Sequence, residues 1–403
     1  MRYAAPVWLL TRALIFLAAM QIIPVGFPMS FENDIRLYSD WSDVLLTGQF
    51  PDNDEKWQYP PFAAIPMLAP HLLPFFDYLV SFFLIAILCD LGILLLIWRF
   101  CRRTGGGEGA VWAWVVGPVL LGPLLIARYD LMVAIFAVAA LTVSVDPAVR
   151  GALIGIGFSI KVWPIALLAG LRRWRELLTG SASAVAATVV ACGATALVMP
   201  NALDFLTAQQ ERGLQVESMA ATPFVLLRAL GLWDGFSTYQ HGAMELAGTG
   251  VDTAIRLAVL ATPVAAVLLV VWWLRAHPTE ATFYDAALTT VLLLVVTSRV
   301  LSPQYMIWLI GLAAVVFSVP GSSQKPVAWL LLAATLLTGI AYPWVEEHYS
   351  WKGELPGTLV LAARNLLLLM AAVLSFRRLW TSTRRPPAED GAGERELDTV
   401  PTS

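Results

Sequence analysis

Charged residues and cysteines are both scarce in this sequence. Asp, Glu, Lys and Arg make up 14% of its 403 residues, hydrophobic residues make up 58%, and the mean hydropathy is +0.70. A soluble globular chain carries about 25% charged residues, so the composition excludes an ordinary soluble protein. Cys89, Cys101 and Cys192 all lie in or at the ends of hydrophobic runs, and no zinc-type Cys/His spacing occurs. Neither an extracytoplasmic disulfide nor a structural zinc site is expected.

The sequence also lacks a basic, aromatic-interleaved surface, an internal repeat and a polar stretch long enough for a soluble domain. A net charge of −3 gives no reason to expect a nucleic-acid partner. What the chain does contain is a series of apolar runs, many of them long enough to approach or cross about 30 Å of hydrocarbon. They predict an all-α polytopic membrane protein with about ten to twelve transmembrane helices. The runs are 7–23, 78–98, 111–127, 131–145, 151–170, 182–199, 252–274, 286–297, 305–319, 327–342 and 358–376.

The loop arginines predict the orientation of the chain in the membrane. If the N-terminus is placed inside, the basic clusters at 99–103, 172–175 and 377–385 all fall on the cytoplasmic side. We therefore expect a multi-pass cell-membrane protein with both termini in the cytoplasm. Residues 1–380 form its membrane domain, and residues 381–403, which contain almost no large apolar side chains, are expected to be a disordered cytoplasmic tail.

This orientation holds only if the run 151–170 enters and leaves the membrane on the same side. Arg150 and the basic cluster at 172–175 flank the run, and Lys161 and Pro164 interrupt it. A re-entrant, broken helix pair that turns near Lys161 satisfies both ends, because irregular backbone at membrane depth is tolerated only against protein or a water-filled cavity. The alternative is a complete span with a misplaced basic cluster.

Two long extracytoplasmic segments, 24–77 and 200–250, are the natural places for function, because long loops in compact proteins usually carry it. In the first, Asp34, Tyr38, Trp41 and Leu45 have the spacing of one helical face. Asp34 is thereby placed beside aromatic side chains, where it could be either an active-site base or a helix N-cap.

The other acids of this loop have simpler explanations. Asp40 and Asp43 share a different face, and Arg36 has the spacing to pair with Asp40. Asp52, Asp54 and Glu55 lie in a sequence typical of a solvated turn. The stiff Tyr59-Pro60-Pro61 that follows is expected to end one segment and start the next.

Three cations in or near the outer half of the membrane are candidates for an anion site. Arg128, Lys161 and Arg299 occupy positions where a charge is costly and usually lines a cavity. Arg128 could instead pair with Asp130, and Arg299 could extend to the interface. Lys161 has no acidic neighbour in sequence. If these cations converge, they form a site for a phosphate.

The second outer segment offers groups of the kind that bind sugar hydroxyls, although an interfacial helix with one wet face is the simpler explanation for each single residue. His241 could be an acid/base group, a hydroxyl ligand or an ordinary loop histidine. The residues that offer such groups are Gln209, Gln210, Glu211, Arg212, Gln215 and Glu217.

Six stretches together resemble glycosyltransferase family 87, a group of membrane enzymes with the GT-C architecture. They are DIRLYSDW followed by LLTG, YPP at 59–61, RYDLMVA, GIGFSIKVWPIALL, RGLQVESMAATP and SRVLSPQYMIWL. The resemblance implies an inverting sugar transfer on the outer face of the membrane, from a polyprenyl-phosphate-sugar donor, most often the mannose compound, to a glycolipid or cell-envelope glycan. It implies a GT-C-like helical bundle with helical outer loops, and it assigns the general base to the acid at Asp34.

The implied site combines this base with the cations. Asp40 is the second choice of base, and Arg128, Lys161 and Arg299 would bind the donor phosphate. The segment 49–61 is more acidic than the family's usual spacer, so it stays open whether Asp54 or Glu55 helps to bind a metal, an acceptor or nothing; no cofactor is expected. A secondary transporter or lipid flippase using Lys161 and the intramembrane arginines is the alternative, although no matched broken helices are evident in the two halves. The substrate-binding candidates are Tyr38, Tyr59, Gln209, Arg212, His241 and Gln304.

Overall fold

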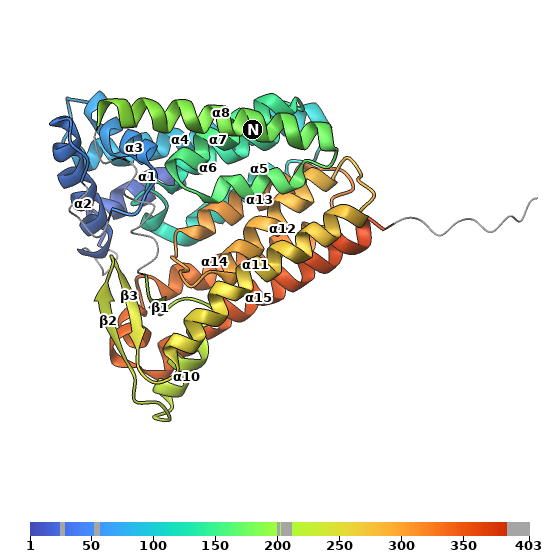
Figure 1. Cartoon of the computed structure of the whole chain (residues 1–403). Coiled ribbons are helices and arrows are strands. Elements are labelled where there is room, and N and C mark those ends of the chain that lie inside the picture. The colour runs from blue at the N-terminus through green and yellow to red at the C-terminus, as the bar shows by residue number, and fades with distance from the viewer. Residues whose placement is uncertain (25–28, 52–56, 200–201, 203–211, 385–403) are drawn as a thin grey trace, which may run out of the picture.

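The computed structural model describes residues 1–24, 29–51, 57–199, 202 and 212–384. Asp52, Asp54, Glu55, Gln209, Gln210, Glu211 and most of the predicted tail lie outside the described residues. The helices pack as one bundle (Figure 1), and α2 (Met29–Leu46) and a small β-sheet occupy one end of it. The described chain stops beyond α15 (Leu355–Ser382) at the opposite end.

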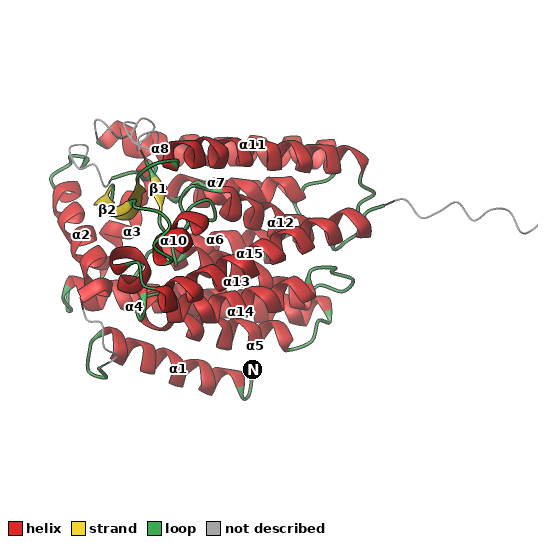
Figure 2. Ribbon diagram, turned by 90° about the horizontal axis from the view of Figure 1, so that it is seen from below, coloured by secondary structure: helices red, strands yellow, loops and turns green. Residues whose placement is uncertain are grey.

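Four helices of the described chain are long and apolar enough to cross a membrane by themselves: α4 (Tyr78–Thr104), α8 (Trp174–Val198), α11 (Val251–Arg275) and α15. At 1.5 Å per residue, their 25–28 residues span about 38–42 Å. Shorter apolar helices complete the bundle beside them (Figure 2), and this arrangement supports the predicted multi-pass helical class. They are α1 (Ala4–Ala19), α5 (Gly109–Val116) continued by the 3₁₀ segment η3 (Gly117–Leu125), α6 (Asp130–Thr142), α7 (Pro147–Ile160), α12 (Thr282–Thr297), α13 (Tyr305–Ser318) and α14 (Lys325–Ala341).

Both ends of the described chain lie at the same end of the bundle. The N-terminal amine is 3.2 Å from Glu108 in the turn after α4, and Gly106 of that turn contacts Ser318 at the end of α13. Arg378, near the end of α15, donates to the carbonyl of Ser323 at 3.2 Å. The shared side of the two ends agrees with the arginine distribution in the sequence.

The run 151–170 is broken at Lys161. α7 ends at Ile160, Lys161 is extended, and the 3₁₀ segment η4 (Trp163–Gly170) returns. Arg150 stacks on the Phe283 ring at 3.9 Å, and Gly170 lies against the same residue. The two ends of the segment therefore meet at Phe283, which is the path expected of a helix pair that enters and leaves on one side.

Small residues let α8 pack closely against α7. A Cβ atom built on Gly151 would overlap the backbone of Gly180, and one on Gly155 would overlap that of Ala184. Such small residues four positions apart allow helix backbones to approach within a membrane. The close contact fixes α7, and with it the break that carries Lys161.

A buried ion pair joins α1 to α4. Arg12 Nε lies 2.8 Å from the Asp90 carboxylate, and both side chains are almost fully buried. Arg12 also donates to the carbonyls of Val115 and Trp114, where α5 gives way to η3. The guanidinium thus satisfies backbone oxygens left at the end of α5.

The end of the bundle opposite to the end of α15 is built from short elements around α2. The first outer segment folds into α2, η1 (Pro61–Ala63), α3 (Ala64–Leu68) and η2 (Ala69–Leu72). The second contributes β1 (Leu214–Gln215), α10 (Thr222–Ala229), β2 (Phe236–Gln240) and β3 (Ala243–Ala247), with the π-helical turn η5 (His348–Lys352) nearby. The strands form an antiparallel sheet in the order β1-β3-β2. The expectation of purely helical outer loops did not include this sheet.

Candidate active site

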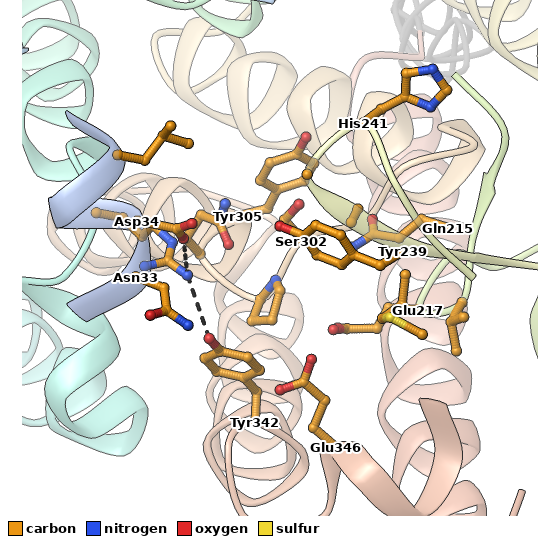
Figure 3. Close-up of a pocket in the computed structure, with 18 of the residues that line it drawn as sticks. Asn33, Asp34, Gln215, Glu217, Tyr239, His241, Ser302, Tyr305, Tyr342 and Glu346 are labelled. Atoms are coloured by element: carbon orange, nitrogen blue, oxygen red, sulfur yellow. Dashed lines mark hydrogen bonds and ion pairs between the residues drawn. The ribbon is translucent and has the colours of Figure 1, made fainter. Parts of the chain in front are cut away.

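A cavity of about 280 Å³ lies at the end of the bundle that carries α2 and the small sheet. It opens between α2, the turn before α6, the β2–β3 hairpin and the segment that follows α14 (Figure 3). Side chains from distant parts of the sequence thus line one space. Its lining includes the predicted residues Asp34, Tyr38, Tyr59, Arg128, Lys161, Arg212, His241 and Gln304.

Asp34 enters this cavity from α2. The helix begins at Met29, so Asp34 lies in its second turn and is not the N-cap that the sequence allowed as an alternative. Tyr38, Trp41 and Leu45 on the same face are each at most 4% exposed, which confirms the predicted apolar face. Asp40, the second choice of base, is exposed and is not among the residues that line the cavity.

Arg128 is the ionic partner of Asp34. The guanidinium forms an ion pair with Asp34 Oδ2 and donates to the carbonyl of Ala127 at 2.9 Å and to Tyr342 Oη at 3.4 Å. These contacts orient the arginine and place the carboxylate at the cavity wall (Figure 3). The alternative that Arg128 pairs with Asp130 is therefore wrong.

Arg36 pairs with Glu32 at 2.8 Å and not with Asp40. Both acids lie one helical turn away from Arg36, so the spacing in sequence allowed either partner.

Lys161 is held at the break between α7 and η4. Its Nζ is 2.8 Å from Asp130 Oδ1, and the indole nitrogen of Trp308 donates to the same oxygen at 2.6 Å. Lys161 Nζ also lies 4.7 Å from the ring centre of Tyr129 and 5.7 Å from that of Tyr305. Aromatic faces at this distance attract a cation. The Lys161 ammonium group is thus held by side chains that are distant from it in sequence.

A second cavity, of about 200 Å³, adjoins the first. Tyr59, Lys161, Arg212 and Tyr305 line both cavities. The second adds Arg299 and apolar walls that include Trp163, Leu294 and Val295. The three predicted cations are therefore distributed: Arg128 lines the first cavity, Arg299 the second, and Lys161 both.

Arg212 and Arg299 lie close enough to influence each other. Burial lowers the pKa of Arg299, and the positive charge of Arg212 lowers it further. β1 connects the two regions, because Gln215 N donates to the Arg299 carbonyl at 3.1 Å and Gln215 Oε1 accepts from Leu301 N at 2.7 Å. An anion between these arginines would relieve their repulsion.

The tip of the β2–β3 hairpin forms one rim of the first cavity. His241 and Gly242 connect the strands with φ of 49° and 76°, and Arg212 donates to the His241 carbonyl at 2.9 Å. The His241 ring lies 3.4 Å from Glu245 Oε1. A two-residue loop with both φ values positive suits the twist of a hairpin. The sequence signal for it was His-Gly between FSTYQ and AMELA.

Two further carboxyl groups line the first cavity: Glu217, one of the polar residues named from the sequence, and Glu346, which had no role in the sequence-based site. Glu217 Oε2 lies 3.1 Å from Arg364 of α15, and burial raises the pKa of this carboxyl. Burial, followed by the negative charge of Glu217, raises the pKa of Glu346 to about 7. Glu346 lies in an ordinary-looking turn, YPWVEEH, and nothing in its local sequence marks it.

Within the described residues, no group of three or more His, Cys, Asp or Glu side chains could hold a metal ion. The site instead offers a carboxylate on one side, cations on another, and hydroxyl-bearing side chains between them. This arrangement can accept a proton from a hydroxyl group and balance charge on a phosphate.

Comparison with known proteins identifies the family. No curated protein matches the sequence. Among solved structures, ArnT from Cupriavidus metallidurans bound to undecaprenyl phosphate is similar to this chain, with 15% sequence identity. The match covers 94% of this chain and 77% of that chain, and its TM-score of 0.35 is too low for a comparison of the two sites. The profile of glycosyltransferase family 87 matches residues 57–303, a stretch that includes Arg128, Lys161, Arg212 and Arg299 and begins after Asp34. The chain belongs to glycosyltransferase family 87.

Proposed function

We propose that this membrane glycosyltransferase moves a mannosyl group from a polyprenyl-phosphate-mannose donor to a hydroxyl of a glycolipid or cell-envelope glycan, with inversion. Transfer takes place at the outer face of the cell membrane, with Asp34 as the general base. The observation that carries the proposal is the pair of adjoining cavities. One contains the Asp34 carboxylate, and the other combines cations with an apolar wall.

The second cavity suits the donor. Lys161, Arg212 and Arg299 line it together with Leu294, Val295 and Trp163, so a phosphate and the start of an apolar chain both find matching surfaces. The sugar then lies where the two cavities meet, beside Tyr59 and Tyr305, which line both. The donor class also agrees with the resemblance of the motifs to this family.

The first cavity suits the acceptor. Asp34 takes the proton of the acceptor hydroxyl while that oxygen forms a bond to the anomeric carbon. The bond from this carbon to the phosphate oxygen breaks, and polyprenyl phosphate leaves with the bonding electrons. Lys161 and its neighbouring arginines stabilise the negative charge of the leaving phosphate. The acceptor oxygen approaches from the first cavity and the phosphate oxygen leaves toward the second. The two oxygens therefore lie on opposite faces of the anomeric carbon, and its configuration is inverted.

The arrangement of the bundle supports the outer-face assignment. α2 and the β2–β3 hairpin, which line the first cavity, lie at the end opposite to the end of α15 (Figure 1). If the arginine-rich side is cytoplasmic, the cavities face outward.

Transfer of labelled mannose by the purified protein tests the proposal. Protein in lipid nanodiscs, given polyprenyl-phosphate-[³H]mannose and a membrane glycolipid extract, should form a labelled glycolipid with the opposite anomeric configuration. Movement of the donor lipid across proteoliposomes without transfer of its sugar would contradict the proposal and favour the transporter alternative.

A further inference from the structure

Glu346 lies in the first cavity, across from Asp34. It follows α14 in the turn that leads to η5, and its carboxyl group points into the space that Glu217 and Tyr342 border (Figure 3). The side chain is therefore directed at the space assigned to the acceptor.

The backbone that carries Glu346 is fixed from two directions. Ser350 Oγ donates to the Glu346 carbonyl at 2.6 Å. Arg228 of α10 donates to the carbonyls of Tyr349 and Ser350, at 3.1 Å and 3.0 Å. A side chain on a segment tied to a separate element can be held in one geometry, which a specificity group requires.

The other two carboxylates of the cavity, those of Asp34 and Glu217, each have a cationic partner. Arg128 pairs with Asp34 and Arg364 pairs with Glu217, while within the described chain no Lys, Arg or His side chain forms an ion pair with Glu346. Burial and the charge of Glu217 bring the pKa of Glu346 to about 7, against the opposing effect of Arg128. The titratable or charged groups that face it are Asp34, Arg128, Glu217, Tyr239, Tyr342, Glu347 and Tyr349.

We propose that Glu346 determines acceptor specificity by accepting a hydrogen bond from a hydroxyl next to the reacting one, so that the enzyme selects an uncharged sugar at this end of the cavity. The inference rests on the proposed function and adds to it the chemical class of the acceptor group. The cations Lys161 and Arg212 lie toward the other cavity, where a phosphate is favoured. Above about pH 7, where Glu346 is ionised, a phosphate beside it would meet a carboxylate and be rejected by like charge.

The substitution Glu346→Gln tests this role, and Glu347→Gln is its matched control. Glu347 is the next residue, but its side chain is 65% exposed and pairs with Lys352 at 3.4 Å, away from the cavity. Each variant would be assayed with polyprenyl-phosphate-mannose and two synthetic acceptors. One is a neutral mannosyl lipid, and the other carries a phosphate on the hydroxyl adjacent to the acceptor hydroxyl.

Glu346→Gln should raise the KM for the neutral acceptor about tenfold, as expected when a hydrogen bond to a charged group becomes a neutral one. The KM for the donor should stay within twofold, and the preference for the neutral over the phosphorylated acceptor should shrink. In the parent protein, kcat/KM for the neutral acceptor should rise with pH through about 7, as Glu346 loses its proton, and this rise should disappear in Glu346→Gln. Glu347→Gln should match the parent protein.

Unchanged acceptor KM and preference in Glu346→Gln would overturn the inference. Transfer by the parent protein would show in the same assay that the proposed function itself stands. If Glu346→Gln fails to fold, Glu346→Asp, which keeps the charge on a shorter side chain, should still favour the neutral acceptor; equal use of both acceptors would again overturn the inference.

Discussion

Asp34 of α2 and Arg128 of the turn before α6 form an ion pair at the wall of the first cavity. The Asp34 side chain is 33% exposed and the Arg128 side chain 9%, so the carboxylate is the more accessible of these two groups of the cavity lining. Arg128 also reaches Tyr342 at 3.4 Å. One arginine thereby connects the predicted base to the segment that carries Glu346.

Replacing Arg128 with lysine should reduce transfer while the protein remains folded. A guanidinium can contact a carboxylate and a hydroxyl together in a fixed fork, whereas an ammonium cannot reproduce this geometry. We expect kcat to fall by about tenfold or more, since small displacements of a catalytic group are costly. Single-turnover rates with saturating donor and acceptor measure this effect. A rate equal to that of the parent protein would show that Asp34 does not depend on Arg128 for its position.

Lys161 has a structural role and a proposed phosphate-binding role, and a pair of variants separates them. Lys161→Met leaves the Asp130 carboxylate buried without its cation, which typically costs about 3–5 kcal/mol. The double variant Lys161→Met/Asp130→Asn removes both charges and should recover most of this stability. Thermal unfolding in nanodiscs measures the recovery. The double variant should still bind the donor weakly, with a raised KM, and full recovery of donor KM would contradict a phosphate-binding role.

The ion pair between Arg12 and Asp90 should affect stability without touching the site. Arg12→Leu leaves a buried Asp90 carboxylate unpaired and should lower the unfolding temperature markedly, whereas Arg12→Leu/Asp90→Leu should recover part of the loss. Folded protein of either variant should keep the donor and acceptor KM values of the parent protein. A changed acceptor KM in the folded double variant would show that the pair acts on the cavity.

Close packing of α7 and α8 should make Gly155 intolerant of a side chain. A Cβ atom on Gly155 would overlap the Ala184 backbone, whereas a Cβ atom on Gly193 of the same helix pair would have nothing within 4 Å. Gly155→Ala should therefore lower the unfolding temperature, and Gly193→Ala should leave it unchanged or raise it slightly, because alanine favours a helix. Equal unfolding temperatures for the two variants would contradict the close packing.

The sequence predicts what periodicity and flanking charge determine. The apolar runs give the helices, and the spacing of Asp34, Tyr38 and Trp41 gives the buried face of α2. Arginines on both sides of the run 151–170 indicate a broken pair, and the chain breaks at Lys161. Each of these features depends on residues that are close in sequence.

Partners that are distant in sequence escape this reasoning. Lys161 meets Asp130, and Arg128 meets Asp34, only because the bundle brings separate helices together. Arg36 had equally spaced acids on both sides, so spacing alone did not decide its partner. The raised pKa of Glu346 depends on burial and on Glu217, neither of which is visible in the local sequence.

The substitution Asp34→Asn tests whether Asp34 removes the proton of the acceptor hydroxyl. The amide keeps the size of the side chain and lacks the basicity of the carboxylate. Rates of mannose transfer would be measured for the parent protein, Asp34→Asn and the exposed control Asp40→Asn. Equal unfolding temperatures of the three proteins would show that both variants are folded. We expect Asp34→Asn to lose transfer by about a thousandfold or more while it binds the donor normally, and Asp40→Asn to be fully active. Full activity of folded Asp34→Asn would contradict this role of Asp34.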